Sequence, residues 1–286
     1  MAVSGFWRSQ LDPERVMNVQ VMHWNEGEQL QREDYLAVEE PFEVRIDGRS
    51  LAVIMRTPGN DFELAMGFLL TEGVIAEAGE VLAIEDAIDA DGLPLANVVN
   101  VSLRERGQSK APVSRPAAFE RHFAVSASCG LCGKNSIDDL MLSQPPLKVG
   151  NLRFPASRIY DLPGKLRAGQ SVFANTGGLH AAGLFTEAGE LSVLREDVGR
   201  HNAVDKIIGL SLLHEEFPYD RHILLVSGRT SFEIIQKALL ARIPCVAAIS
   251  APSSLAVDLA NQGGITLIGF LRDHSMNVYT HPERIL

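Results

Sequence analysis

The chain has 286 residues, of which 46% are hydrophobic and 22% charged, so it can bury a sizeable core in one large domain or two of moderate size. Its net charge of −10 argues against a general binder of nucleic acid or of membrane surfaces, since such proteins carry a basic excess. No run approaches the ~20 apolar residues of a bilayer span, and the N-terminus lacks the pattern of a secretion signal. We therefore expect a soluble, cytoplasmic protein without nucleic-acid partners and without membrane insertion.

The first part of the chain predicts an α+β unit. Apolar and polar residues alternate on both sides of Asp47-Gly48, a pair typical of the tight turn in a β-hairpin. Apolar positions then recur at helical spacing as far as Gly73, a common helix-ending residue. The expected elements are a hairpin at 35–56, a helix from Asn60 or Asp61 to Gly73, and strands at 81–86 and 97–103.

Residues 104–122 form a basic stretch with two prolines and little periodicity. This stretch predicts a linker that ends an N-terminal unit of residues 1–122. A solvated loop is the simpler interpretation, whereas its position just before the cysteines also suits an anionic substrate or an acidic partner.

Cys129 and Cys132 lie three positions apart in a glycine-rich loop and are two of the three cysteines in the chain. Lys134 and a short helix expected at 136–142 would place positive charge beside the thiols and favour the nucleophilic thiolate. An odd number of cysteines in a chain of this length does not predict a disulfide framework. Cys245 lies in an apolar strand, which predicts a buried small hydrophobe.

Three functions are open to the cysteine pair, which we assign to a mobile segment at 123–145. A zinc site needs four ligands, and without a second cysteine pair it would need distant residues such as His180 or His201. A thioredoxin-like dithiol is expected to open a long helix after a first strand, whereas this pair follows a coil. A sulfur carrier needs an exposed thiol of lowered pKa that can hold sulfur as a persulfide, and this loop favours such a thiol.

The chain from residue 146 onward predicts an α/β domain. Continuous apolar strands alternate there with helices, a pattern typical of parallel strands covered on both faces. Asp197 is as consistent with a helix cap as with a ligand contact. The expected elements are a hairpin formed by 178–185 and 191–195, a helix after Asp197, strands at 223–226, 244–250 and 265–270, and helices at 231–242 and 253–261.

Polar, small or basic residues follow the predicted parallel strands. In open α/β sheets, ligands bind at these carboxyl ends. Gly228 would let the backbone approach a ligand, while Arg229 and Arg272 supply guanidinium donors, so the combination predicts a phosphate or pyrophosphate site. The three strand ends are Ser227-Gly228-Arg229, 250–254 and Phe270–Ser275.

Two further segments, Thr176–His180 and Asp197–Asn202, strengthen this prediction. Each of their histidines taken alone is equally consistent with a satisfied, partly buried side chain. Arg200 and Asn202 fall in the first turn of a predicted helix, where core packing gives little reason for them. We therefore expect their side chains to be free for a ligand.

Several of these motifs together carry a resemblance to a known family. They are Ser126–Asp138, Glu196–Lys206, Thr176–His180, Ser227–Glu233 and the tail from Gly269 to Thr280. The sequence resembles the formate dehydrogenase accessory sulfurtransferase family, FdhD/NarQ, over nearly everything after residue 35.

The resemblance implies a cytoplasmic sulfur carrier, a sulfurtransferase that receives sulfur from a cysteine desulfurase. The sulfur would pass to the molybdenum bis(guanylyl-molybdopterin) cofactor, Mo-bis-MGD (bis-molybdopterin guanine dinucleotide), before that cofactor enters formate dehydrogenase. Cys129 would carry the persulfide with Cys132 assisting, the cofactor would be a bound substrate, and no permanently bound metal is expected. The residues expected to contact the cofactor are Gly177, Gly178, His180, Arg200, His201, Asn202, Ser227, Gly228, Arg229, Phe270, Leu271, Arg272, Asp273, His274 and Ser275.

Members of this family are homodimers, and their C-terminal domain is similar to the cytidine deaminase fold. The expected fold is therefore α/β, with an α+β N-terminal unit and a three-layer C-terminal domain, residues 146–286, around a mixed, largely parallel sheet. Deamination itself is not expected, because Ser227–Thr230 stands where a deaminase has its paired zinc cysteines and Leu179–Ala182 lacks the catalytic glutamate. Two alternatives to sulfur transfer stay open: a non-catalytic chaperone for the molybdenum cofactor, and a zinc-stabilised binding module.

Overall fold

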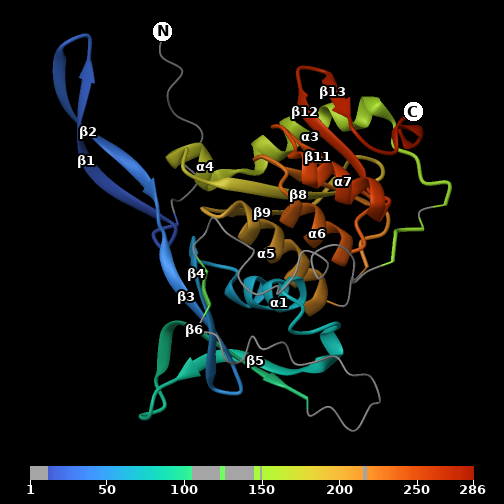
Figure 1. The fold of residues 1–286 in the computed structure, drawn as a ribbon. Coiled ribbons are helices and arrows are strands. Elements are labelled where there is room, and N and C mark those ends of the chain that lie inside the picture. Colours follow the sequence, from blue (N-terminus) through green and yellow to red (C-terminus); the bar gives the residue numbers. More distant parts are fainter. Residues whose placement is uncertain (1–11, 105–122, 126–144, 149, 215–217) are drawn as a thin grey trace.

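The computed structural model in Figure 1 describes residues 12–104, 123–125, 145–148, 150–214 and 218–286. Nearly all of the predicted basic linker, both cysteines of the pair and the helix expected at 136–142 lie outside the described residues. The expected boundaries at residues 122 and 145 also fall there or beside it, so they stay predictions.

The N-terminal unit contains a five-stranded sheet with the strand order β5-β6-β3-β4-β7. Its central hairpin turns at Asp47-Gly48, and both residues have positive φ angles, 49° and 78°, as the tight turns of hairpins require. The predicted hairpin and the two strands after it are confirmed. The strands are β3 Glu40–Ile46, β4 Arg49–Arg56, β5 Val81–Ile88, β6 Pro94–Leu103 and β7 Phe123–Val125.

A long hairpin that the sequence analysis did not predict precedes this sheet. Strands β1 (Val16–Asn25) and β2 (Glu28–Ala37) form an antiparallel two-stranded sheet of their own. We call this segment, Val16–Ala37, the arm. It projects from the body of the molecule in Figure 1, and its base packs against α4 (Ser171–Thr176).

The C-terminal sheet has six strands in the order β13-β12-β11-β10-β8-β9. The strands are β8 His180–Thr186, β9 Leu191–Asp197, β10 His222–Val226, β11 Cys245–Ala248, β12 Thr266–Arg272 and β13 Ser275–Val278. Only β10, β11 and β12 pair in parallel, whereas β8, β9 and β13 join antiparallel. The expected mixed sheet is confirmed, but its parallel part is smaller than "largely parallel" implied, because the flanking strands return through hairpins.

Helices cover both faces of this sheet and make the expected three layers. One face packs against α3 (Ala156–Gly169), and the other packs against α5 (Arg200–Leu213), α6 (Phe232–Leu240) and α7 (Ser254–Gly263). Cys245 is fully buried beneath α3, as predicted for a small hydrophobe, and burial raises the pKa of its thiol to about 12. Helix α3 was not predicted, since it contains a proline that normally breaks helical patterns.

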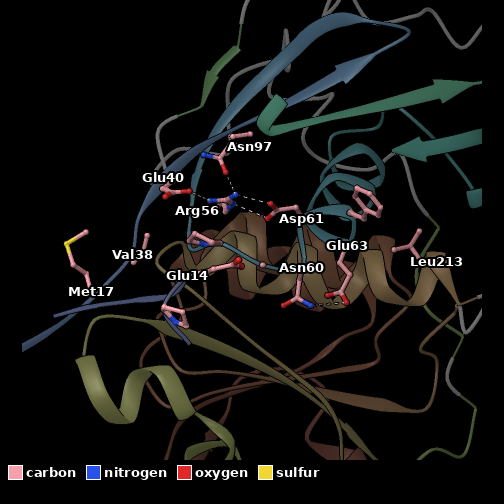
Figure 2. Close-up of a pocket in the computed structure, with 15 residues that line it drawn as sticks. Glu14, Met17, Val38, Glu40, Arg56, Asn60, Asp61, Glu63, Asn97 and Leu213 are labelled. Carbon is pink, nitrogen blue, oxygen red and sulfur yellow. Dashed lines mark hydrogen bonds and ion pairs between the residues drawn. The ribbon is translucent and has the colours of Figure 1, made fainter. Parts of the chain in front are cut away.

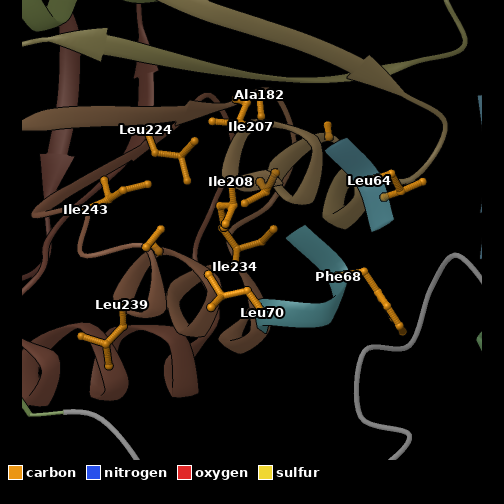
Figure 3. Close-up of a cluster of buried hydrophobic side chains, with 14 of the residues drawn as sticks. Leu64, Phe68, Leu70, Ala182, Ile207, Ile208, Leu224, Ile234, Leu239 and Ile243 are labelled. Atoms are coloured by element: carbon orange, nitrogen blue, oxygen red, sulfur yellow. The ribbon is translucent and has the colours of Figure 1, made fainter. Parts of the chain in front are cut away.

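Helix α1 (Asp61–Thr71), which belongs to the predicted N-terminal unit, packs directly on α5. Figure 3 shows Leu64 and Phe68 of α1 in the same apolar cluster as Ile207 of α5. The helices approach so closely because glycines face each other. A Cβ at Gly67 would lie 1.9 Å from the backbone oxygen of Asp205, and one at Gly209 would lie 1.7 Å from that of Glu63.

The α1–α5 contact predicts that Gly67→Ala destabilises the protein. The added methyl must push two helix backbones apart, which costs about 3 kcal/mol or more of unfolding free energy. Urea unfolding followed by circular dichroism measures the loss. Gly164→Ala in α3 is the control, because a Cβ there meets nothing within 4 Å and should leave stability equal or higher by up to ~1 kcal/mol. Equal midpoints for Gly67→Ala and the unmodified chain would contradict the close contact.

Candidate functional site

The loops after β10, β11 and β12 meet at one edge of the C-terminal sheet, which we call the strand-end edge. Backbone hydrogen bonds link these loops: the N–H of Thr230 donates to Ala251 O, and the N–H of Phe270 donates to Ser250 O. The N–H of Ser227 also donates to Ala181 O of β8. The structure therefore brings together the three segments that the sequence placed at strand ends.

Gly228 is the point where His180 and Arg200 come together. A Cβ at this position would lie 3.2 Å from Nδ1 of His180 and 3.7 Å from Cδ of Arg200, so only glycine leaves this space open. Nε of Arg200 is buried and has no hydrogen-bond partner among the described residues. A buried donor without a partner is unfavourable, so this guanidinium is suited to receive an anionic ligand.

His201 is buried beside the N-terminus of α6. Its Nε2 lies 3.2 Å from Oγ of Ser231 and 3.9 Å from a carboxylate oxygen of Glu233. Burial, followed by the nearby Lys237 and Arg200, lowers the pKa of His201 to about 4, so the ring is neutral at pH 7. The facing carboxylate favours a proton on Nε2, which leaves Nδ1 as a hydrogen-bond acceptor.

The imidazole of His180, like that of His201, has a lowered pKa. Its side chain is partly buried at the start of β8. Burial and then the positive charge of Arg200 lower its pKa, against a smaller opposing effect of Asp197. Near Gly228 the strand-end edge therefore combines the Arg200 guanidinium with two uncharged imidazoles, a set that can donate to phosphate oxygens and accept from N–H or O–H groups.

Asn202 is not free for a ligand, contrary to the prediction. It is buried, and its Nδ2 donates to Oδ1 of Asp197 and to the backbone oxygen of Met55, both at 2.8 Å. Asp197 is not the helix cap either, since Gly199 occupies that position. Instead, Asp197 accepts the N–H of Gly199 at 2.8 Å and shapes the turn just before α5.

A fully buried ion pair anchors this turn to the N-terminal unit. Nζ of Lys206 lies 2.8 Å from Oδ2 of Asp197 and donates to the backbone oxygen of Thr57 at 2.9 Å. The N–H of Thr57 donates back to Asp197 at 3.2 Å. Burial lowers the pKa of Lys206 while Asp197 opposes this shift, so attraction to the carboxylate holds the charge inside the protein.

The remaining predicted contacts divide between the surface and the core. Gly177 and Gly178 are exposed and lie next to the base of the arm. Leu271 is fully buried beneath α3, so only its backbone can reach a ligand. The exposed members around the β12–β13 turn and α6 are Arg229, Phe270, Arg272, Asp273, His274 and Ser275.

Sequence reasoning missed Ser231 and Glu233 as partners of His201. The signal was present, because serine followed by an acidic residue typically begins a helix and so places both groups at the start of α6.

A cavity of about 870 Å³ lies elsewhere, between the base of the arm and the N-terminal unit. Figure 2 shows Arg56 at its wall, bound to Asp61, Glu40 and Asn97. Leu213, the last residue of α5, also lines it, whereas the strand-end edge lies at the first residues of that helix. Since these polar groups satisfy one another, we assign the cavity no ligand.

Within the part of the chain that the structure describes, no three His, Cys, Asp or Glu side chains group as a metal site would require. None of the described helices combines the length and apolar character needed to cross a bilayer.

A model of the FdhD/NarQ family matches residues 37–286, which is most of the chain. The chain belongs to the FdhD/NarQ family. Among its relatives are three proteins named "Sulfur carrier protein FdhD". That of Nocardia farcinica is 49% identical over 90% of each chain. That of Streptomyces coelicolor is 49% identical over 93% of this chain and 94% of the relative, and that of Sulfurisphaera tokodaii is 47% identical over 92% and 95%.

A crystal structure shares the fold of this family member. It is that of a protein assigned as a formate dehydrogenase accessory protein from Desulfotalea psychrophila. The TM-score is 0.72 over 95% of this chain and 100% of that chain, at 24% identity. The likeness confirms the α/β architecture.

The Lys206–Asp197 ion pair predicts a large effect for Lys206→Met. Removing the ammonium leaves a buried carboxylate without its counter-charge, which costs about 3–5 kcal/mol of unfolding free energy. Chemical denaturation measures the loss. The double variant Lys206→Met/Asp197→Asn removes both charges and should recover part of it. A single variant as stable as the unmodified chain would contradict the anchoring role.

Proposed function

We propose that this protein is a sulfur carrier for the maturation of formate dehydrogenase. Cys129 accepts sulfur from a cysteine desulfurase as a persulfide, and Cys132 assists. The sulfur then passes to Mo-bis-MGD before this cofactor enters the dehydrogenase. The observation that carries the proposal is 49% identity, over nine tenths of the chain, to proteins named as sulfur carriers.

The first step is a thiolate displacement. The Cys129 thiolate attacks the outer sulfur of the desulfurase persulfide, a new S–S bond forms, and the desulfurase cysteine leaves as a thiolate. No electrons are gained or lost overall. Lys134 and the glycines around the pair favour this step, because positive charge stabilises the thiolate and the small residues leave room for the donor.

The strand-end edge is the proposed binding site for the cofactor as substrate. Its guanine dinucleotide phosphates need positive donors, and Arg200, Arg229 and Arg272 supply them at this edge. The unpartnered Nε of Arg200 fits such a role, and neutral His180 and His201 suit the N–H groups of a guanine or pterin ring. The remaining proposed contacts are Gly177, Gly178, Ser227, Gly228, Phe270, Leu271, Asp273, His274 and Ser275. Asn202 acts only through its support of the turn before α5.

The resemblance to the family also supports a cytoplasmic homodimer. A reducing compartment keeps the cysteine pair free to accept sulfur, since stable disulfides are rare there.

Intact-protein mass spectrometry tests the sulfur-carrier role. After anaerobic incubation with a cysteine desulfurase and cysteine, the unmodified chain should gain the mass of one sulfur atom, because the Cys129 thiolate displaces the outer sulfur of the donor. Cys129→Ala should not gain it. Cys245→Ala is the matched control and should behave like the unmodified chain, since that thiol is buried. No added sulfur in the unmodified chain would refute the proposal.

A titration with GDP tests the cofactor site independently of sulfur chemistry. Arg200→Ala and Arg272→Ala should each weaken GDP binding by about 10- to 100-fold, the range for a lost charge-assisted hydrogen bond. Arg158→Ala is the control, because Arg158 is an exposed residue of α3, which packs on the face of the sheet opposite α5. Isothermal calorimetry measures the affinities. Binding that survives both arginine variants unchanged would place the nucleotide elsewhere.

A further inference from the structure

Ser231 occupies the N-cap position of α6 but does not cap that helix. A serine at an N-cap normally accepts a hydrogen bond from a backbone N–H of the first turn. Ser253 does so for α7, where its Oγ accepts the N–H of Ala256 at 3.3 Å, whereas the side chain of Ser231 makes no such bond. The hydroxyl of Ser231 lies instead 3.2 Å from Nε2 of His201.

Glu233 is the second partner of this hydroxyl. Burial raises the pKa of Glu233, but a hydrogen bond with the Ser231 side chain and one from its own backbone N–H together outweigh burial and lower the pKa. The carboxyl group is therefore ionised at neutral pH. An ionised carboxylate can only accept hydrogen bonds, so the proton of the Ser231 hydroxyl is donated to Glu233.

The two contacts of Ser231 fix the direction of the hydrogen bonds from Glu233 to His201. A serine hydroxyl has one proton to donate, and its lone pairs can accept. Since that proton goes to Glu233, Oγ of Ser231 accepts the N–H of Nε2 of His201. A neutral imidazole carries one N–H, so this bond leaves Nδ1 of His201 without a proton and able to accept.

The charges around His201 keep the ring neutral, as this tautomer requires. Burial, followed by the positive charges of Lys237 and Arg200, lowers the pKa of His201 to about 4, against a smaller opposing effect of Glu233. Nδ1 of His201 forms no hydrogen bond with any described residue. This nitrogen is therefore available to accept from a ligand.

His201 lies among the groups proposed to bind the cofactor. It follows Arg200 in the first turn of α5, and both Arg200 and His180 are close enough to affect its pKa. A guanine ring presents an N–H at N1, where adenine presents a lone pair. An acceptor held in one tautomer bonds to the first and repels the second, which is how a site discriminates between two rings of similar shape.

We propose that Ser231 and Glu233 are positioning residues of the cofactor site, which hold the proton of His201 on Nε2 so that Nδ1 accepts from a ring N–H and selects guanine over adenine. Neither residue has to touch the cofactor for this role. The inference rests on the cofactor site of the proposed function and adds the residues that determine its base preference.

Calorimetric titrations with GDP, ADP and pyrophosphate test the base preference. The unmodified chain should bind GDP about 10-fold or more tightly than ADP, the factor expected for one directed hydrogen bond. Ser231→Ala/Glu233→Ala should lose most of this preference and keep its affinity for pyrophosphate, which has no ring to recognise. Ser231→Thr retains the hydroxyl and should retain the preference.

Ser211→Ala is the matched control for these titrations. Ser211 lies near the other end of α5, and its buried hydroxyl donates to Ile208 O at 2.7 Å, so its loss should leave the preference for GDP unchanged. An undiminished preference in the double variant, or equal affinities of the unmodified chain for GDP and ADP, would overturn the proposal. Loss of pyrophosphate binding in the double variant would also overturn it, because the two residues would then support the whole site.

Nitrogen-15 NMR of the ligand-free chain, labelled at its histidines, measures the tautomer directly. His201→Gln identifies the signals of His201, which at pH 7 should show a protonated Nε2 and an unprotonated Nδ1. The double variant should shift toward a mixture of the two tautomers. A proton on Nδ1 of the unmodified chain together with normal GDP binding would refute this inference alone, whereas a chain that binds no GDP would refute the cofactor site on which it rests.

Discussion

Lys206 and Asp197 form an ion pair that is withdrawn from water, and the position of three segments depends on it. Lys206 belongs to α5, Asp197 ends β9, and Thr57, which follows β4, bonds to both. Burying two charges is unfavourable unless attraction and hydrogen bonds compensate. The carboxylate here also accepts N–H donors from Gly199 and Asn202. The pair therefore fixes where α5 begins, and α5 begins with Arg200 and His201.

The strand-end edge carries less positive charge than its sequence suggests, because His180 and His201 are uncharged. The chain as a whole carries −10, so an anionic ligand is repelled at long range and must be held by local donors. Arg200 provides such a donor, while the lowered pKa values of His180 and His201 leave both rings uncharged. Recognition there depends on the direction of individual hydrogen bonds rather than on a broad positive surface.

Local patterns predicted most of the fold, and long-range contacts account for what they missed. The turn at Asp47-Gly48 and the apolar strands β10–β12 have clear sequence signals. Helix α3 was missed because Pro163 lies inside it, and the arm was missed because β2 is rich in polar residues. Asn202 was taken as free for a ligand because its partner Met55 lies 147 positions away, which no periodicity reveals.

The packing of α1 on α5 has a consequence for folding in the cell. The two helices are separated by about 130 residues of intervening chain. At ribosomal rates of about 5–20 residues per second, α1 leaves the ribosome roughly 6–26 s before α5 exists to cover it. During that interval its apolar side chains lack their final neighbours. Nascent-chain chaperones are therefore expected to contact this helix, and the high sequence separation of the contact favours slow, late completion of the core.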